Sequence, residues 1–133
     1  MGIIIDSSVL IAAERGKLDL RAVLQRFGGE TVSFSIVTAS ELLHGEHRAT
    51  SGAIRAGRSA FVEGLRARFP VLPIDMAVAR KHAEISAALA TAGKPVGAHD
   101  LLIAASAMAR GDRVVTRDAR SFPLIPGLLF DVV

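Results

Sequence analysis

Short apolar runs alternate along the chain with longer segments of helical period. The runs at residues 2–5, 31–34 and 113–116 are mainly apolar or β-branched, which favours strands. The run at residues 2–5 is unbroken, as is typical of a strand buried on both faces. Two further short strands are predicted at residues 71–74 and 128–133, the second of them at an edge of the sheet.

Helices are predicted between these strands, where apolar positions recur with helical period. Ser7 and Ser8 are expected to cap the first helix, and Asp75 is expected to cap the fifth, which stops at Gly93. The first helix begins near residue 9, and the others cover residues 18–27, 36–48, 53–69, 76–93 and 98–110.

Strands that alternate with helices predict an α/β fold, a three-layer sandwich with a central, mostly parallel sheet flanked by helices. The 133 residues, 50% of them hydrophobic, suit a single domain over residues 1–133. The absence of cysteine excludes a disulfide framework, a thiolate zinc site and a cysteine nucleophile. We find no secretory signal and no apolar stretch near the roughly 20 residues of a membrane span, so a cytoplasmic protein is expected.

Two acidic residues follow predicted strands at the edge where parallel sheets bind ligands. Asp6 comes directly after residues 2–5, and Asp118 lies two residues beyond residues 113–116. Ligands of open parallel sheets bind in a crevice outside the carboxyl ends of the strands. We therefore expect both carboxylates to face one crevice.

Asp100 and Glu41 each have two interpretations. Asp100 lies in the first turn of the helix at residues 98–110, where an acid also stabilises a helix through its dipole. Glu41 ends the sequence TASE of residues 38–41, which is typical of a capping box that returns the glutamate to the backbone of Thr38. Either residue is therefore a helix-stabilising acid or a member of a site.

Four carboxylates gathered at one place would require a cation between them, because their charges repel. The four candidates are Asp6, Glu41, Asp100 and Asp118. Ligation by oxygen alone favours Mg²⁺ or Mn²⁺ over zinc. Such an ion activates water and offsets charge on a phosphodiester, so the residues predict metal-assisted phosphodiester hydrolysis.

The charge balance fits a polyanionic substrate such as RNA. Sixteen Lys and Arg face 13 Asp and Glu, and removing the four candidate acids leaves 9 acids, or a net +7 on the rest of the chain. A negative pocket on a basic body would guide a polyanion to a bound cation. An ordinary basic surface explains the same numbers.

The histidines and glycines indicate no other active site. His44 and His47 are three residues apart without an HExxH motif, so solvated side chains are expected. His99 either contacts substrate beside Asp100 or lies on the surface, and His82 is expected to be structural. Neither a G-x-S-x-G motif nor a phosphate-binding glycine loop is present.

Five segments occur in a characteristic order and spacing: residues 4–11 (IIDSSVLI), 35–42 (SIVTASEL), 100–105 (DLLIAA), 115–118 (VTRD) and 125–128 (IPGL). Together they extend over nearly the whole chain. In this combination the sequence resembles the PIN-domain nucleases, especially the VapC-type toxins.

The resemblance implies a PIN-like fold and an endoribonuclease that acts as the toxin of a toxin–antitoxin pair. It implies dependence on Mg²⁺ or Mn²⁺. It also implies a homodimer and a cognate antitoxin whose C-terminal segment blocks the acidic site. Our mechanistic hypothesis is that metal-activated water attacks an RNA phosphate in line and leaves 5′-phosphate and 3′-hydroxyl ends.

The resemblance also implies roles for particular residues. Four acids match the family's metal-binding positions: Asp6, Glu41, Asp100 and Asp118. The last of these is either a direct ligand or a residue that supports the ligands. Thr116 and Ser7 match supporting positions, and Ser7 stands where threonine is usual.

Two alternatives lie outside this family. A phosphoryl-transfer domain that uses a strand-end aspartate as nucleophile would want a second aspartate at position 8, which is Ser8. A non-catalytic module that binds RNA or a partner protein would use the same acids only to stabilise helices. A trapped aspartyl phosphate, or RNA binding without metal-dependent cleavage, would distinguish these alternatives from a nuclease.

Overall fold

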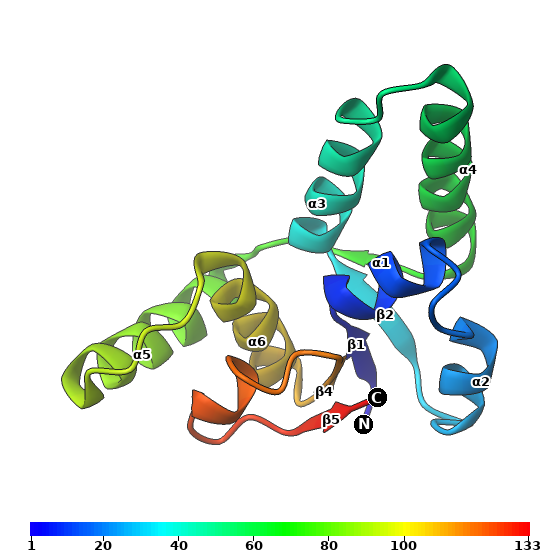
Figure 1. The fold of residues 1–133 in the computed structure, drawn as a ribbon. Helices are drawn as coiled ribbons and strands as arrows, with labels where there is room; N and C mark the ends of the chain where they lie inside the picture. Colours follow the sequence, from blue (N-terminus) through cyan, green and yellow to red (C-terminus); the bar gives the residue numbers. More distant parts are fainter.

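The computed structural model describes all residues from Met1 to Val133 and shows a sheet flanked by helices (Figure 1). The strands are β1 (Ile3–Ile5), β2 (Val32–Ser35), β3 (Val71–Leu72), β4 (Arg113–Thr116) and β5 (Phe130–Val132). The helices are α1 (Ser7–Glu14), α2 (Leu20–Gln25), α3 (Ile36–His47), α4 (Gly52–Arg68), α5 (Met76–Ala92) and α6 (Ala98–Arg110), with a 3-10 turn η1 (Phe122–Leu124) before β5. The predicted three-layer α/β fold is confirmed.

The sheet has the strand order β3-β2-β1-β4-β5, and every neighbouring pair is parallel. The chain builds outward from β1 through β2 to β3 and then returns to place β4 on the other side of β1. The direction of winding therefore changes between β1 and β4, where Ile5 pairs with Val115. The carboxyl ends of strands at such a switch point form the usual ligand site of an open parallel sheet.

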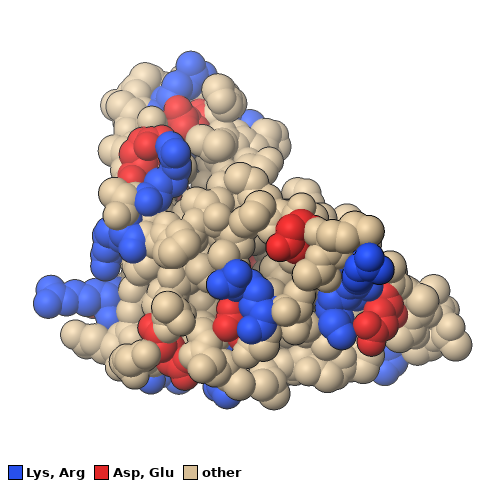
Figure 2. All heavy atoms as spheres, turned by 180° about the vertical axis from the view of Figure 1, so that it is seen from behind, with Lys and Arg blue, Asp and Glu red and all other residues tan.

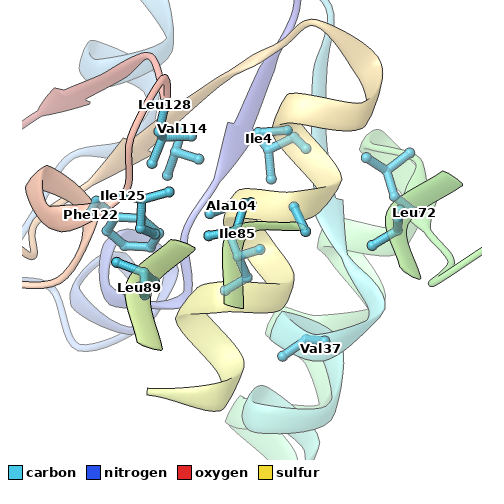
Figure 3. Close-up of a cluster of buried hydrophobic side chains, with 14 residues drawn as sticks. Ile4, Val37, Leu72, Ile85, Leu89, Ala104, Val114, Phe122, Ile125 and Leu128 are labelled. Carbon is cyan, nitrogen blue, oxygen red and sulfur yellow. The ribbon is translucent and has the colours of Figure 1, made fainter. Parts of the chain in front are cut away.

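The alternation of side chains along β1 and β4 divides the interior into two clusters, one on each face of the sheet. Ile4 and Val114 belong to the cluster covered by α5 and α6, while Ile3, Ile5 and Val115 belong to the cluster covered by α1, α2 and α4. Figure 3 shows the first cluster, with the side chains of α6 between the sheet and α5. Burial on both faces explains why the β1 run contains no polar residue.

Several predicted boundaries differ from the observed ones. α1 begins at Ser7 rather than near Val9, and its N-cap residue is Asp6, which makes no side-chain capping bond. The prediction that Ser7 and Ser8 cap this helix is therefore wrong. The predicted cap of α5 is confirmed, because the Asp75 carboxylate accepts a hydrogen bond from the Val78 amide at 3.0 Å.

Two helical hairpins give the molecule its shape. α3 packs against α4, and α5 packs against α6. In Figure 1 the α3–α4 pair stands away from the sheet, and α5 extends in a different direction. The space-filling view from behind shows a notch between these two arms (Figure 2). No helix combines the length and the apolar character needed to cross a membrane.

The two-sided burial of β1 generates a stability prediction. Ile4 is 0% exposed, and Ile4→Ala should lower the free energy of unfolding by about 2–5 kcal/mol because it leaves a cavity beneath α6. The matched control is Ile54→Ala on α4, where the side chain is 47% exposed and a change of about 0.5 kcal/mol or less is expected. Urea unfolding of both variants measures the difference, and equal losses would contradict the assigned core.

Candidate active site

Asp6 is fixed at the switch point of the sheet by two hydroxyl groups. It is 3% exposed, and its amide donates to the Val115 carbonyl of β4 at 2.9 Å. Its Oδ2 atom accepts hydrogen bonds from Ser8 at 2.6 Å and from Thr116 at 2.8 Å. Hydrogen bonds to a carboxylate are short and strong, so this side chain is held in one orientation.

The same two hydroxyls hold the loop that follows β4. Ser8 Oγ accepts a hydrogen bond from the Arg117 amide at 3.0 Å, and Thr116 Oγ1 accepts one from the Asp118 amide at 2.9 Å. Each hydroxyl therefore donates to Asp6 and accepts from the loop. Asp118 is therefore linked to Asp6 through Thr116, and the neighbouring Arg117 is linked to Asp6 through Ser8.

Asp118 closes the turn beyond β4. Its Oδ1 atom accepts from the backbone amides of Arg120 at 2.7 Å and Ser121 at 3.3 Å. The hydrogen bond from the Arg120 amide is the main reason that the pKa of Asp118 lies below its ordinary value, since it favours the ionised form. Phe122, which is 0% exposed, anchors the next turn in the core.

Asp100 lies in the first turn of α6, as predicted. Burial raises the pKa of the Asp100 carboxyl above its ordinary value, and the negative charge of Asp6 raises this pKa further. A hydrogen bond with the Ser121 side chain acts in the opposite direction, and the charges of Asp118 and Glu41 add to the rise. The charges of the other three predicted acids thus all act on Asp100 at this edge of the sheet.

Glu41 is not a capping residue. The N-cap of α3 is Ser35, whose hydroxyl accepts from the Val37 amide at 3.1 Å. The capping-box interpretation is therefore wrong, because α3 begins before Thr38 and places that residue inside the helix. The Glu41 Oε1 atom instead lies 2.9 Å from Nδ1 of His99, next to Asp100.

Three of these contacts were not predicted from the sequence. Ser8 was expected to be a cap, and the role of His99 was left open. Ser7 was expected to be a supporting residue but had no predicted partner, whereas its hydroxyl donates to Thr38 Oγ1 at 2.9 Å and so connects α1 to α3. The pair of hydroxyl residues at positions 7 and 8 could have indicated these contacts. Successive residues of a helix point in different directions, so Ser7 reaches Thr38 of α3 while Ser8 reaches Asp6.

The other histidines lie apart from this site. His44 and His47 are exposed on α3, and His82 is partly buried on α5.

The carboxylate oxygens of the four acids are the type of donor that a hard cation prefers. Their side chains are not arranged as a complete coordination site. No group of three or more His, Asp or Glu side chains is positioned to hold a metal ion. The surface hollows are lined by neither Asp6, Asp100 nor Asp118, so the expected crevice is an open edge. The donors are all oxygen, and one oxygen each of Asp6, Glu41 and Asp118 accepts no hydrogen bond. Such donors fit Mg²⁺ or Mn²⁺.

The fold and the acidic switch point agree with the comparison to known families. The family model described as PIN domain matches residues 3–128, and the chain belongs to this family. Its relatives place it more narrowly among the VapC ribonucleases. The resemblance found in the sequence is confirmed, and with it the class of enzyme, an endoribonuclease.

Three similar proteins support this placement. Ribonuclease VapC1 of Rickettsia felis is 34% identical over 128 residues, which cover 96% of this chain and 93% of that protein. The tRNA(fMet)-specific endonuclease VapC of Shigella flexneri is 38% identical over 94 residues, covering 71% of this chain and 69% of that protein. The crystal structure of VapBC-5, a member of the VapBC family of toxin–antitoxin systems from Mycobacterium tuberculosis, superposes with a TM-score of 0.76 at 31% identity, covering 100% of this chain and 98% of that chain.

The raised pKa of Asp100 generates a prediction about stability. The folded state binds the Asp100 proton more tightly than the unfolded state does, so the fold loses stability as the pH rises from the ordinary value of 3.8 through the raised pKa. In the absence of divalent metal, Asp100→Asn should raise the melting temperature by a few degrees at neutral pH. This gain should disappear near pH 3.8.

Asp118→Asn should change the melting temperature in the opposite direction. The lowered pKa of Asp118 gives stability that is present above the ordinary value and is lost as the pH falls through the lowered pKa. This substitution should therefore lower the melting temperature at neutral pH. Thermal unfolding in EDTA measures both variants, and a decrease for Asp100→Asn would show that its carboxylate is not under electrostatic strain.

Proposed function

We propose that the protein is a Mg²⁺-dependent endoribonuclease that acts as the toxin of a toxin–antitoxin pair. The observation that carries this proposal is the immobilised carboxylate of Asp6 at the switch point, next to an Asp100 whose pKa is raised by burial and by the other acids. The negative charges of these carboxylates repel one another, and a divalent cation bound between them would remove that repulsion.

In this proposal Asp6, Glu41 and Asp100 hold the cation, with Asp118 as the fourth acid. A cation held by these residues would supply charge neutralisation for the scissile phosphodiester and would favour ionisation of an attacking water molecule. The residues of the chain supply orientation. Ser8 and Thr116 both donate to Asp6 Oδ2 and so leave Oδ1 as the oxygen available for the cation.

His99 has a positioning role in the proposed site. A carboxylate can only accept, so Nδ1 of His99 must donate to Glu41 Oε1 across their 2.9 Å separation. This contact ties α3 to the start of α6 and leaves Glu41 Oε2 available. The side chain of His99 is 60% exposed and that of Glu41 is 26% exposed, so the link lies on the solvent side of the site, where RNA can reach it.

The proposed partners are an antitoxin and a second copy of the chain. The similar Mycobacterium tuberculosis structure belongs to a toxin–antitoxin system by its own description. An open acidic edge that cuts RNA would need a protein to cover it until activity is required. In our proposal the antitoxin covers the acidic edge. The proposed substrate is RNA, because the relatives are ribonucleases.

The function is tested by cleavage of RNA with purified protein. Wild type should cut bulk tRNA in Mg²⁺ and lose this activity in EDTA. Asp6→Asn and Asp100→Asn should reduce the rate to the EDTA level, because each removes a charge from the metal site while keeping the side-chain shape. Asp19→Asn is the matched control, since Asp19 caps α2 and asparagine caps equally well.

Sequencing of RNA ends after induction in cells, with Asp6→Ala beside wild type, identifies the substrate. Full activity of the Asp6 or Asp100 variants, or cleavage that persists in EDTA, would refute the proposal. Binding of RNA without any metal-dependent cleavage would favour a non-catalytic module.

The role of His99 is tested by metal affinity. His99→Ala should weaken Mn²⁺ binding by about 10–100-fold, the usual cost of removing a residue that orients a metal ligand. His99→Asn, which keeps a donor at a similar position, should recover part of the affinity. Calorimetric titration of Mn²⁺ measures both, and unchanged affinity in His99→Ala would show that the contact does not organise Glu41.

A further inference from the structure

Two adjoining surface hollows form a groove along α3 that begins at Glu41. The inner hollow is lined by Glu41 together with Ile11, Leu42, Phe61 and Val62, and by Glu14. The outer hollow lies between the ends of α1, α3 and α4, and its lining includes Arg48 and Thr50. The two hollows share three lining residues: Arg15, Gly45 and Arg58.

The outer hollow has a basic lining without any acid. Three arginines converge there from three helical segments: Arg15, Arg48 and Arg58. Arg58 is held in place, because it donates to the Gly45 carbonyl at 2.7 Å and lies 3.4 Å from Glu14. Arg15 and Arg48 are exposed and make no ion pair or hydrogen bond through their side chains. Two guanidinium groups are therefore available to a ligand.

The start of α4 adds to the attraction for anions. Ser51 caps this helix by accepting from the Ile54 amide at 3.1 Å, and the preceding amides of the first turn have no partner within the helix. The helix is 17 residues long, and its N-terminus carries a partial positive charge. Thr50 and Ile54, on either side of that N-terminus, both line the outer hollow.

We propose that this groove carries the RNA strand away from the acidic site, with Arg15 and Arg48 binding phosphates a few nucleotides from the one that is cut. This inference rests on the proposed nuclease function. Arg48, the C-cap of α3, follows Glu41 by seven positions, a rise of roughly 10.5 Å, so a few nucleotides extend from one to the other.

Several observations favour RNA over a protein in the outer hollow. Guanidinium groups bind phosphate in a bidentate manner, and only Ala49 and Ile54 are apolar among its lining residues. The chain has no Trp or Tyr, so stacking on bases contributes little, and phosphate contacts must supply most of the affinity. On the face seen in Figure 2, most of the basic side chains lie beside acidic ones.

The test measures RNA binding as a function of salt in the Asp6→Asn background, which prevents cleavage. Addition of Arg15→Gln and Arg48→Gln should weaken binding of a labelled single-stranded RNA by about tenfold. It should also reduce the slope of log K against log salt by about 1.4, since each lost phosphate contact on a single strand contributes about 0.7. Lysine at both positions should restore most of the slope.

The matched control carries Arg21→Gln and Arg80→Gln, which remove the same charge from exposed positions on α2 and α5. It should keep the slope of the parent. Equal slopes for the groove variant and the control would overturn the inference. The inference is also overturned if the groove variant binds RNA normally but loses a protein that wild type binds.

Cleavage by otherwise wild-type protein separates this inference from the proposed function. If wild type cuts RNA in Mg²⁺ and the groove variant does so with unchanged KM, the inference fails while the function stands. If wild type does not cut RNA at all, the function itself fails. A raised KM with kcat within about twofold of wild type is the expected result.

Discussion

The structure depends on the immobilisation of one buried carboxylate, Asp6, by two hydroxyl groups. Ser8 and Thr116 both donate to its Oδ2 atom, and both accept amide hydrogen bonds from the loop after β4. β1, α1 and β4 are thereby joined at the point where the sheet changes direction. The cost of burying a charge is offset locally by charge-assisted hydrogen bonds, and this fixed charge raises the pKa of Asp100.

The strained member of the acidic group is Asp100. Its pKa is raised while that of Asp118 is lowered, although both residues lie at the same edge of the sheet. The difference arises because Asp118 receives backbone hydrogen bonds and Asp100 is partly buried among other acids. The ionised Asp100 carboxylate therefore lowers the stability of the fold at neutral pH, and in our proposal a bound cation would recover that loss.

The sequence was sufficient for the fold and for placing Asp6 and Asp118 after the ends of neighbouring strands, but it was insufficient for the contacts that these acids make. Apolar periodicity located every strand and helix, because burial on two faces of a parallel sheet leaves strong patterns. Helix starts were less reliable, since Ser7, Ser8 and Thr38 are favourable caps that the folded chain uses for other contacts. The link from His99 to Glu41 joins residues 58 positions apart, and no local pattern records such a distance.

The hairpin of α3 and α4 is anchored at its base and free at its tip. No residue from Leu43 to Phe61 is buried, whereas Leu42, Val62 and Leu65 belong to the core. Local opening of a segment requires little free energy where few apolar contacts are lost. Amide hydrogens at the tip should therefore exchange with solvent much faster than those at the base, so the two ends of one helical hairpin differ in local stability.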